Sequence, residues 1–427
     1  MTTRLRALVM FALLVAGCVK KDNPNYCPGL NADNNCAEGD AGLMPCANNT
    51  QCTTSTAAIC DTQLHACVQC TPTQTSACMK ATPICGTDER CRGCASHAEC
   101  PISNACLPDG SCADAGDVAY VSAAPDGTDN PLCTMAMPCT KIMKALATNR
   151  PYLKLHGSFD EPVTISNRAI TVLADPGAAL TRSSSGPILS VDGSSNVKVY
   201  DLEISGASGM AAVLLPNGSN QTVTLSHVSM TRNNGTGGAV LAQGGTLNID
   251  RSKIFNNTSG GVSISMAQFD IENNFITGNG TDIGTTPTIY GGVLLSQTNT
   301  GTRILSFNTI FANKGGPAAV TGVLCDLLSQ DLTASNNVIY GNTAAGIGAQ
   351  VGGAHCSWTY SDIGPDAVPG NVSVDPGFGP GDFHLQSTSP LINQADPNAT
   401  LGIDIDGDAR PQGGRRDIGA DEYTPGK

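Results

Sequence analysis

Residues 247–257 read Leu-Asn-Ile-Asp-Arg-Ser-Lys-Ile-Phe-Asn-Asn, and residues 269–279 read Phe-Asp-Ile-Glu-Asn-Asn-Phe-Ile-Thr-Gly-Asn. Both follow one 11-residue pattern, apolar-x-apolar-x-x-(Asn)-x-Ile-x-x-Asn, which recurs between about residues 201 and 342. Its Ile slot holds Ile204, Met230, Ile254, Ile276, Ile310 and Ile339, at gaps of 26, 24, 22, 34 and 29 residues. The slot three residues later holds Ala207, Asn233, Asn257, Asn279, Asn313 and Asn342. Periods of this size are typical of stacked repeat architectures.

A second apolar series shares this repeat and consists of Val213, Val240, Val262, Val293, Val320 and Val351. Two series at one period predict at least two short strands in each coil. Each strand then pairs with its copy about 4.8 Å away, so inward side chains form ladders and the Asn amides hydrogen-bond along the axis. The alternative is that these residues lie in the surface loops of a β-sandwich, but sandwich strands do not recur with this matching side-chain order.

The start of this domain reads as a strand at Ala119-Tyr120-Val121, a short helix over 141–147 capped by Thr140, and a strand at 161–165. The end reads Val374-Asp375-Pro376-Gly377-Phe378, then Asp404-Ile405-Asp406-Gly407-Asp408, then Asp417-Ile418-Gly419-Ala420-Asp421-Glu422. Residues 117–423 thus resemble the right-handed parallel β-helices of the pectate-lyase-like group. The final run is similar to the terminal segment of the "choice-of-anchor Q" surface proteins, which implies that residues 374–427 cap the exposed end of the coil stack.

The N-terminus has the features of an export signal. Arg4 and Arg6 precede an apolar run from Leu8 to Val15, and Leu14-Val15-Ala16-Gly17-Cys18 resembles a bacterial lipobox. The resemblance implies cleavage before Cys18 and lipidation of that residue, and Val19 in the next position implies the outer membrane. We therefore expect a protein anchored through its N-terminal lipid at the outer membrane or cell surface. The alternative is an ordinary free cysteine.

Removing Cys18 from the 19 cysteines leaves 18, and fourteen of these lie from Cys27 to Cys112. Dense, even-numbered cysteines in an exported chain predict a disulfide framework, because units with so few large apolar residues cannot bury a core. The array resembles the cysteine-rich stalks of bacterial lipoproteins. The spacing of Cys67, Cys70, Cys91 and Cys94 also matches a four-cysteine zinc site, which remains the alternative. Further on, Cys133 is expected to pair with Cys139, and Cys325 with Cys356.

The predicted fold class is therefore all-β: a right-handed parallel β-helix solenoid preceded by a small, disulfide-rich and mostly irregular region. The predicted segments are a signal peptide (1–17), a lipidated tether (18–35), cysteine-rich repeats (36–112), the β-helix (113–373) and its C-terminal cap (374–427).

Composition and motifs exclude several function classes. The net charge of −13 argues against nucleic acid as a partner, which requires a clustered basic face. The sequence contains no phosphate-binding loop, so we expect no nucleotide, and it contains no His-Glu-x-x-His or Gly-x-Ser-x-Gly motif. The single Trp and eight Tyr do not indicate a platform for stacking sugar rings.

The resemblance makes polysaccharide cleavage the natural enzymatic hypothesis, since lyases of this group use acidic calcium ligands and an Arg or Lys base. Aligning the repeats places Asp250 and Glu272 in one column, with Arg251 beside Asp250 and Arg232 one coil earlier. These four are the catalytic candidates. The alternative is a solvent-facing column of mixed polar residues, because its other positions are Tyr200, Ser226, Ser306 and Ser335.

A second acidic group, Asp404, Asp406 and Asp408, alternates around Gly407. Side chains two residues apart in an extended loop could converge on Ca²⁺, the one cofactor that the sequence suggests. Alternatively, Arg410 neutralises the group in a structural ion pair.

From the sequence we therefore expect a lipid-anchored surface protein whose β-helix is a non-catalytic binding, adhesion or structural rod. Its partner would be a polysaccharide or another surface component. The alternative is a surface polysaccharide lyase or glycoside hydrolase.

Overall fold

The computed structural model describes residues 44–426, except 55, 124–126, 128–129, 219, 284–286, 297–300, 327–330, 347 and 366–367. The predicted signal peptide and tether, with Cys18, Cys27 and Cys36, lie outside these described residues. The chain divides into two compact units, one ending at Asp114 and the other beginning at Ala115.

The first unit contains little regular structure. Two antiparallel pairs join β1 (Ile59–Asp61) to β2 (Ala66–Val68) and β3 (Ile84–Cys85) to β4 (Cys91–Arg92). Three 3-10 turns lie at Asn49–Gln51, His97–Glu99 and, at the junction with the second unit, Ala115–Asp117. Ile59 and Val68, which pair across β1 and β2, are the only branched apolar side chains buried among the described residues of this unit.

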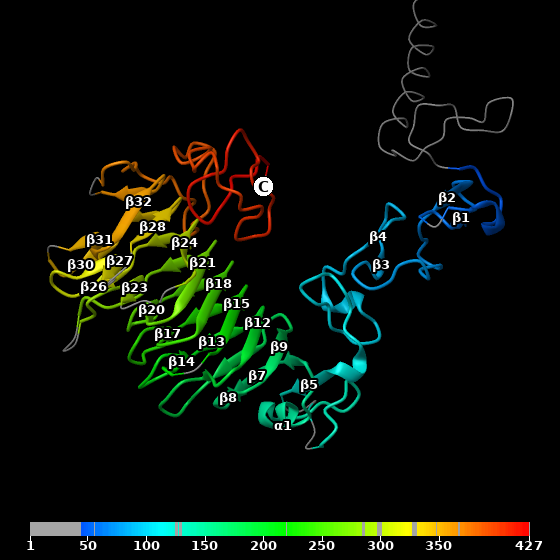
Figure 1. Cartoon of the computed structure of the whole chain (residues 1–427), viewed down its shortest axis with the longest axis horizontal. Helices are drawn as coiled ribbons and strands as arrows, with labels where there is room; N and C mark the ends of the chain where they lie inside the picture. Colours follow the sequence, from blue (N-terminus) through cyan, green and yellow to red (C-terminus); the bar gives the residue numbers. More distant parts are fainter. Residues whose placement is uncertain are drawn as a thin grey trace, which may run out of the picture. The chain divides into compact units, whose positions relative to one another are not determined.

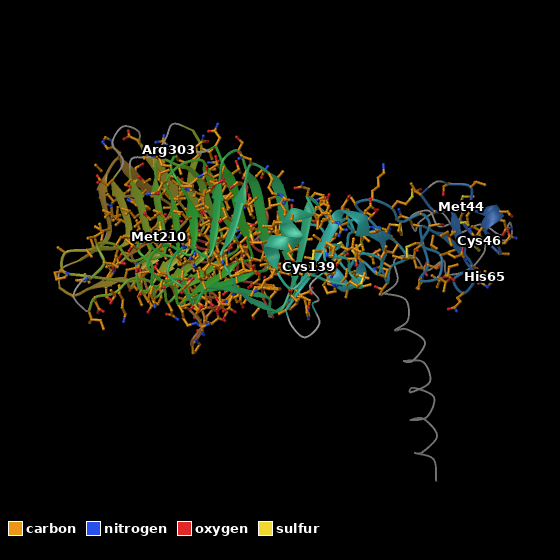
Figure 2. All side chains as sticks on the ribbon, turned by 90° about the horizontal axis from the view of Figure 1, so that it is seen from below. Met44, Cys46, His65, Cys139, Met210 and Arg303 are labelled. Carbon is orange, nitrogen blue, oxygen red and sulfur yellow. A yellow bond between two sulfur atoms is a disulfide. The ribbon has the colours of Figure 1, made fainter. Side chains whose placement is uncertain are left out.

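Six disulfides hold the described residues of the first unit together. They join Cys46–Cys60, Cys52–Cys67, Cys70–Cys85, Cys78–Cys91, Cys94–Cys106 and Cys100–Cys112. Each group of four cysteines therefore pairs first with third and second with fourth. The zinc interpretation is wrong, because the four thiols it requires each bond to a different cysteine. Figure 2 shows the disulfides in yellow, with Cys46 in the first unit and Cys139 in the second labelled.

The second unit is a parallel β-solenoid built from three long sheets (Figure 1). The β5–β32 sheet contains β5 (Val118–Ser122), β6 (Tyr152–His156), β9 (Ala169–Ala174), β12 (Asn196–Tyr200), β15 (Thr222–Ser226), β18 (Thr246–Asp250), β21 (Gln268–Glu272), β24 (Arg303–Ser306), β28 (Leu332–Ser335) and β32 (Cys356–Thr359). The β7–β33 sheet contains β7 (Ser158–Asp160), β10 (Ala179–Thr181), β13 (Glu203–Ser205), β16 (Ser229–Thr231), β19 (Lys253–Phe255), β22 (Phe275–Thr277), β25 (Thr309–Phe311), β29 (Val338–Tyr340) and β33 (Asp362–Gly364).

The β8–β31 sheet contains β8 (Val163–Ser166), β11 (Leu189–Asp192), β14 (Val213–Leu215), β17 (Val240–Ala242), β20 (Val262–Ser265), β23 (Val293–Ser296), β27 (Val320–Asp326) and β31 (Ala349–Ala354). A small additional pair joins β26 (Lys314–Gly315) to β30 (Thr343–Ala344). Each complete coil thus contributes three strands, where the sequence had indicated at least two.

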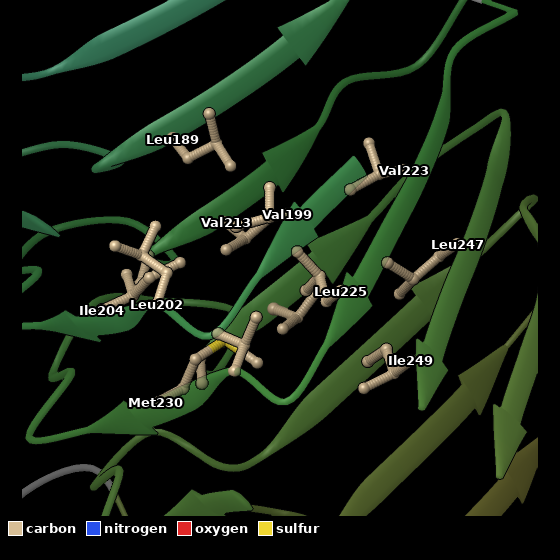
Figure 3. Packing of buried hydrophobic residues seen from close by; sticks show 14 of the residues in the cluster. Leu189, Val199, Leu202, Ile204, Val213, Val223, Leu225, Met230, Leu247 and Ile249 are labelled. Carbon is tan, nitrogen blue, oxygen red and sulfur yellow. The ribbon is translucent and has the colours of Figure 1, made fainter. Parts of the chain in front are cut away.

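Strand alternation places apolar ladders from all three sheets in the interior (Figure 3). The six residues of the Ile slot pair in register along the β7–β33 sheet and are fully buried. In Figure 3, Ile204 and Met230 follow one another in this ladder, and Val223, Leu225, Leu247 and Ile249 belong to the β5–β32 sheet. The sequence pattern therefore predicted both the coil repeat and its inward face.

The buried asparagines form a continuous hydrogen-bonded ladder at one corner of the coils. Asn257 Nδ2 donates to Asn279 Oδ1 at 2.8 Å and to the Met230 carbonyl of the preceding coil at 3.0 Å. The same pattern continues through Asn313 to Asn342, where Gln350 Oε1 accepts the last bonds. A second ladder at another corner runs through Asn274, Asn308 and Asn337. Every buried amide in these ladders has partners, so polar side chains are accommodated in the core.

Two details of the sequence interpretation are wrong. Val320 does not continue the valine ladder: Val323 pairs with Val293 and Val351, and a bulge between Val320 and Val323 shifts the register. Thr140 does not cap helix α1 (Ile142–Ala147), whose N-cap is Lys141. The first helical N–H, that of Ile142, instead donates to Glu161 Oε1 at 3.0 Å.

The C-terminal segment, residues 374–426, packs along the side of the coils. Phe383 contacts Phe275 of β22 and Phe378 contacts Phe311 of β25, with ring centroids 5.8 and 5.2 Å apart. The Ala420 N–H donates to Thr309 Oγ1, and the Gly419 N–H donates to the Asn336 carbonyl. The expectation of a cap over the end of the stack is therefore corrected, because this segment finds its apolar partners on the outer face of β22, β25 and β29.

Candidate functional site

The predicted acidic column lies on the outer face of the β5–β32 sheet. Tyr200, Ser226, Asp250, Glu272, Ser306 and Ser335 pair in this order on successive strands. Asp250 and Glu272 are therefore direct neighbours, separated by one strand spacing of about 4.8 Å.

Both carboxylates of this column already have partners from the coils themselves. Arg251 Nε donates to Asp250 Oδ2 at 2.7 Å, and Ser226 Oγ donates to the same oxygen at 3.2 Å. The hydroxyl of Ser306 bonds to Glu272 Oε1. The Arg251 guanidinium thus neutralises Asp250, and each of the two carboxylates already has a partner within the coils.

Arg232 does not belong to this group. It follows β16, whereas Asp250 ends β18, so a three-residue strand of the β7–β33 sheet lies between their two corners. At about 3.3 Å per residue this strand separates the corners by roughly 10 Å. The Arg232 side chain is 73% exposed and lies 3.4 Å from Glu203 Oε1. The four predicted residues thus do not line one groove.

Asp270, which the sequence analysis missed, lies two residues before Glu272 on the same face of β21. Burial raises the pKa of Asp270, and the negative charge of Asp250 adds to this effect. Among the described residues, no hydrogen-bond donor reaches Asp270 Oδ1, which is buried. Burial also raises the pKa of Glu272, although its bond to Ser306 opposes the shift. The period-two alternation of the strand was the signal that could have identified Asp270.

A column of left-handed residues turns the chain from the β5–β32 sheet into the β7–β33 sheet. Its members include Asp201, His227, Arg251, Asn273, Phe307 and Asn336, all with positive φ. His227 Nδ1 lies 3.7 Å from Asp201 Oδ1. Burial lowers the pKa of His227, and the positive charge of Arg251 lowers it further. Nearby carboxylates act in the opposite direction and raise this pKa. Asp406 of the C-terminal segment is one of those carboxylates, so this segment reaches the corner beside the acidic column.

The predicted calcium group does not converge. Asp404 is fully buried, and its oxygens accept the backbone N–H groups of Asp406, Asp408 and Glu422. Asp406 is turned toward His384 instead, with its Oδ2 2.7 Å from Nε2 of that histidine. Loop-type hydrogen bonds therefore occupy Asp404, so the three carboxylates do not converge on one cation.

Arg410 forms a structural ion pair, as the alternative interpretation predicted. Its partner is Glu422, however, and not the group of Asp404, Asp406 and Asp408. Arg410 is buried, its Nη1 lies 3.4 Å from Glu422 Oε2, and its Nη2 donates to the Gly419 carbonyl. Its guanidinium also lies over the ring of Phe307, 5.0 Å from the centroid. Arg410 thus fastens the C-terminal segment to the corner column.

The two predicted pairings outside the first unit, Cys133–Cys139 and Cys325–Cys356, are disulfides in the structure. The lipidation residue Cys18 lies outside the described residues. Among the residues that the structure describes, none forms a helix with the length and apolarity needed to cross a bilayer.

Comparison with known proteins identifies the solenoid. Residues 163–323 and 216–362 match the family described as "Right handed beta helix region", so the second unit contains a right-handed β-helix domain. No curated protein sequence matches the chain. Among solved structures, pectate lyase Pel9A is similar with 16% identity and a TM-score of 0.45, over 72% of this chain and 96% of that one. Similarity of this degree does not transfer the activity of that enzyme to this chain.

Proposed function

We propose that this protein is a lipid-anchored surface protein whose β-helix is a non-catalytic rod for binding, adhesion or structural support. In this proposal Cys18 carries the lipid, the outer membrane or cell surface is the location, and the disulfide-linked repeats act as a stalk. The partner of the rod is a polysaccharide or another surface component.

One observation carries the non-catalytic part of the proposal. The residues that a lyase would use are engaged with each other and with neighbouring coils: Arg251 with Asp250, and Glu272 with Ser306. An arginine whose charge is neutralised by an adjacent carboxylate is a poor base, because the ion pair favours its protonated form. Arg232, the other candidate base, lies at a different corner beside Glu203.

The test is a combined binding and depolymerisation screen against polysaccharides, with and without Ca²⁺. The chain carries Cys18→Ser, so that it is obtained without lipid and with its disulfides intact. We expect no release of unsaturated or reducing ends. Binding without cleavage would identify the rod as an adhesin, and neither binding nor cleavage would assign it a structural role.

Polysaccharide cleavage is the second candidate, and Asp270 is the observation that favours it. Its buried Oδ1 accepts no hydrogen bond from the described residues. Asp270 also lies on the same outer face as Asp250 and Glu272, at adjoining positions of the sheet. If the screen detects cleavage, Asp270→Asn and Arg251→Ala should abolish it. Arg232→Ala is the matched control and should leave it unchanged, because that arginine lies at another corner.

A further inference from the structure

His384 lies at the centre of a group of carboxylates within the C-terminal segment. Its Nδ1 contacts Asp382, and its Nε2 lies 2.7 Å from Asp406 Oδ2. The ring packs edge-on against Phe275 of β22, with centroids 5.2 Å apart and planes at 84°. The imidazole is therefore held in one orientation by the apolar face of the solenoid and by a carboxylate on Nδ1.

Asp421 approaches the same imidazole from a third part of the segment. It is only 6% exposed, and its Oδ2 accepts the Leu385 N–H at 2.6 Å. Within the part of the chain that the structure describes, its other oxygen accepts no hydrogen bond. One ligand atom each from His384, Asp406 and Asp421 lie within 4.8 Å of one another. Asp421 thus has one carboxylate oxygen that no hydrogen bond from the described residues uses and that is available to a ligand.

The charges of this group do not balance. Three carboxylates, those of Asp382, Asp406 and Asp421, surround one imidazole. Even a protonated ring leaves two negative charges uncompensated. The buried guanidinium of Arg410 is paired with Glu422 and with backbone carbonyls, and its positive charge also acts on Asp421. One such charge, shared among several carboxylates, does not balance the group.

We propose that His384, Asp406 and Asp421 bind one divalent transition-metal ion of the Zn²⁺ type. His384 would bind through Nε2, while Asp382 orients the ring through Nδ1, an arrangement that metal-binding histidines commonly use. An imidazole with two carboxylates suits Zn²⁺, whereas Ca²⁺ prefers six or more oxygen ligands.

The ion would link three parts of the C-terminal segment that no strand or helix joins among their described residues: 382–384, 404–408 and 417–422. Because His384 also rests on Phe275, the ion would fasten this segment to the solenoid. The site is distinct from the acidic column of Asp250 and Glu272, and the hydrogen bonds of Asp404 position the loop that carries Asp406.

The test titrates the full chain, carrying Cys18→Ser with its disulfides intact, with Zn²⁺ by calorimetry after dialysis against a chelator. We expect one Zn²⁺ per chain and a higher thermal midpoint with the ion bound. His384→Gln and Asp406→Asn should each weaken binding at least tenfold and remove the thermal shift. Asp406 is 41% exposed, so its variant should fold even if His384→Gln does not.

His355→Gln is the matched control. His355 Nδ1 lies 3.0 Å from Asp331 Oδ1, but both side chains are exposed, and among the described residues no third ligand group accompanies the pair. This variant should bind Zn²⁺ like the parent chain. Zn²⁺ binding that His384→Gln and Asp406→Asn leave unchanged, tighter binding of Ca²⁺ than of Zn²⁺, or no Zn²⁺ binding would each overturn the proposal.

Discussion

The cysteine-rich unit and the β-helix are both built from repeats of about the same length, yet different interactions stabilise them. The first unit has two buried branched apolar side chains among its described residues and six disulfides. The β-helix has a continuous buried core and amide ladders that run from coil to coil. A repeat that cannot bury a core alone therefore has two solutions: covalent links inside each repeat, or stacking on the next one.

Reduction of the disulfides should reveal the largest difference in stability between the cysteine-rich unit and the β-helix. We expect a reductant to unfold residues 44–114, because a disulfide closing about 15 residues contributes roughly 3 kcal/mol and little apolar burial remains without it. The β-helix should keep its structure, since its ladders do not depend on Cys133–Cys139 or Cys325–Cys356. Hydrogen exchange measured by mass spectrometry on the reduced chain checks this. Unfolding of both units together would contradict the comparison.

Asn279→Ala should destabilise the β-helix by about 2–4 kcal/mol, since it leaves buried amide partners unsatisfied. The variant removes the acceptor for Asn257 and the donor to Asn313, in a ladder that is fully buried. Urea unfolding followed by circular dichroism measures the loss. Asn248→Ala is the control, because Asn248 lies on the outer face with one bond to Thr224, so its effect should stay below about 0.5 kcal/mol. Equal effects of the two substitutions would show that the ladder adds no stability.

Asp362, in the last coil, should make the β-helix less stable as pH rises. It is fully buried, its Oδ1 accepts the Val374 N–H, and its Oδ2 has no donor among the described residues. Burial raises its pKa to about 7 from the ordinary 3.8, and nearby Asp375 adds to the rise. The folded state therefore favours the protonated carboxyl. This contribution is complete below about pH 4 and is lost as pH rises through 7.

Asp362→Asn keeps the acceptor and removes the charge, so the variant should not share this loss. The difference in unfolding free energy between parent and variant should change by roughly 4 kcal/mol between pH 4 and 8, since the pKa rises from 3.8 to about 7 and one pKa unit corresponds to about 1.4 kcal/mol. Urea unfolding across this range measures it. A difference that stays constant with pH would show that the Asp362 carboxyl does not titrate between these limits in the folded state.

The sequence predicted the coil repeat because buried positions recur with the same residue types. The Ile and Asn slots are both interior, and no loop is inserted within the 11-residue pattern that contains them. The sequence-based prediction was wrong at Val320, because a β-bulge adds residues to the strand without changing its apolar character. The position of residues 374–426 was also missed, because apolar residues such as Phe275 and Phe311 on the outer face are visible only when the strands are in register.

The candidate sites were less predictable, because the contacts between their residues also form only when the coils are stacked. Arg232 and Arg251 each follow a strand directly, so the sequence does not show that they turn different corners. Likewise, Asp404, Asp406 and Asp408 alternate in the chain, but backbone N–H groups occupy Asp404 while Asp406 faces His384. The orientation of Asp406 depends on His384, 22 residues away, and local spacing does not contain that information.

The C-terminal segment also bears on how such a protein can change length in evolution. It hydrogen-bonds to Asn273 and Asn336 and places Arg410 over the ring of Phe307, and these three residues hold the same corner position in consecutive coils. Duplicating a coil between β22 and β29 would move these contacts apart by one strand spacing, whereas a coil added before β16 would leave them in place. One half of the rod is thus free to gain or lose whole repeats by recombination, and the other half has a fixed number.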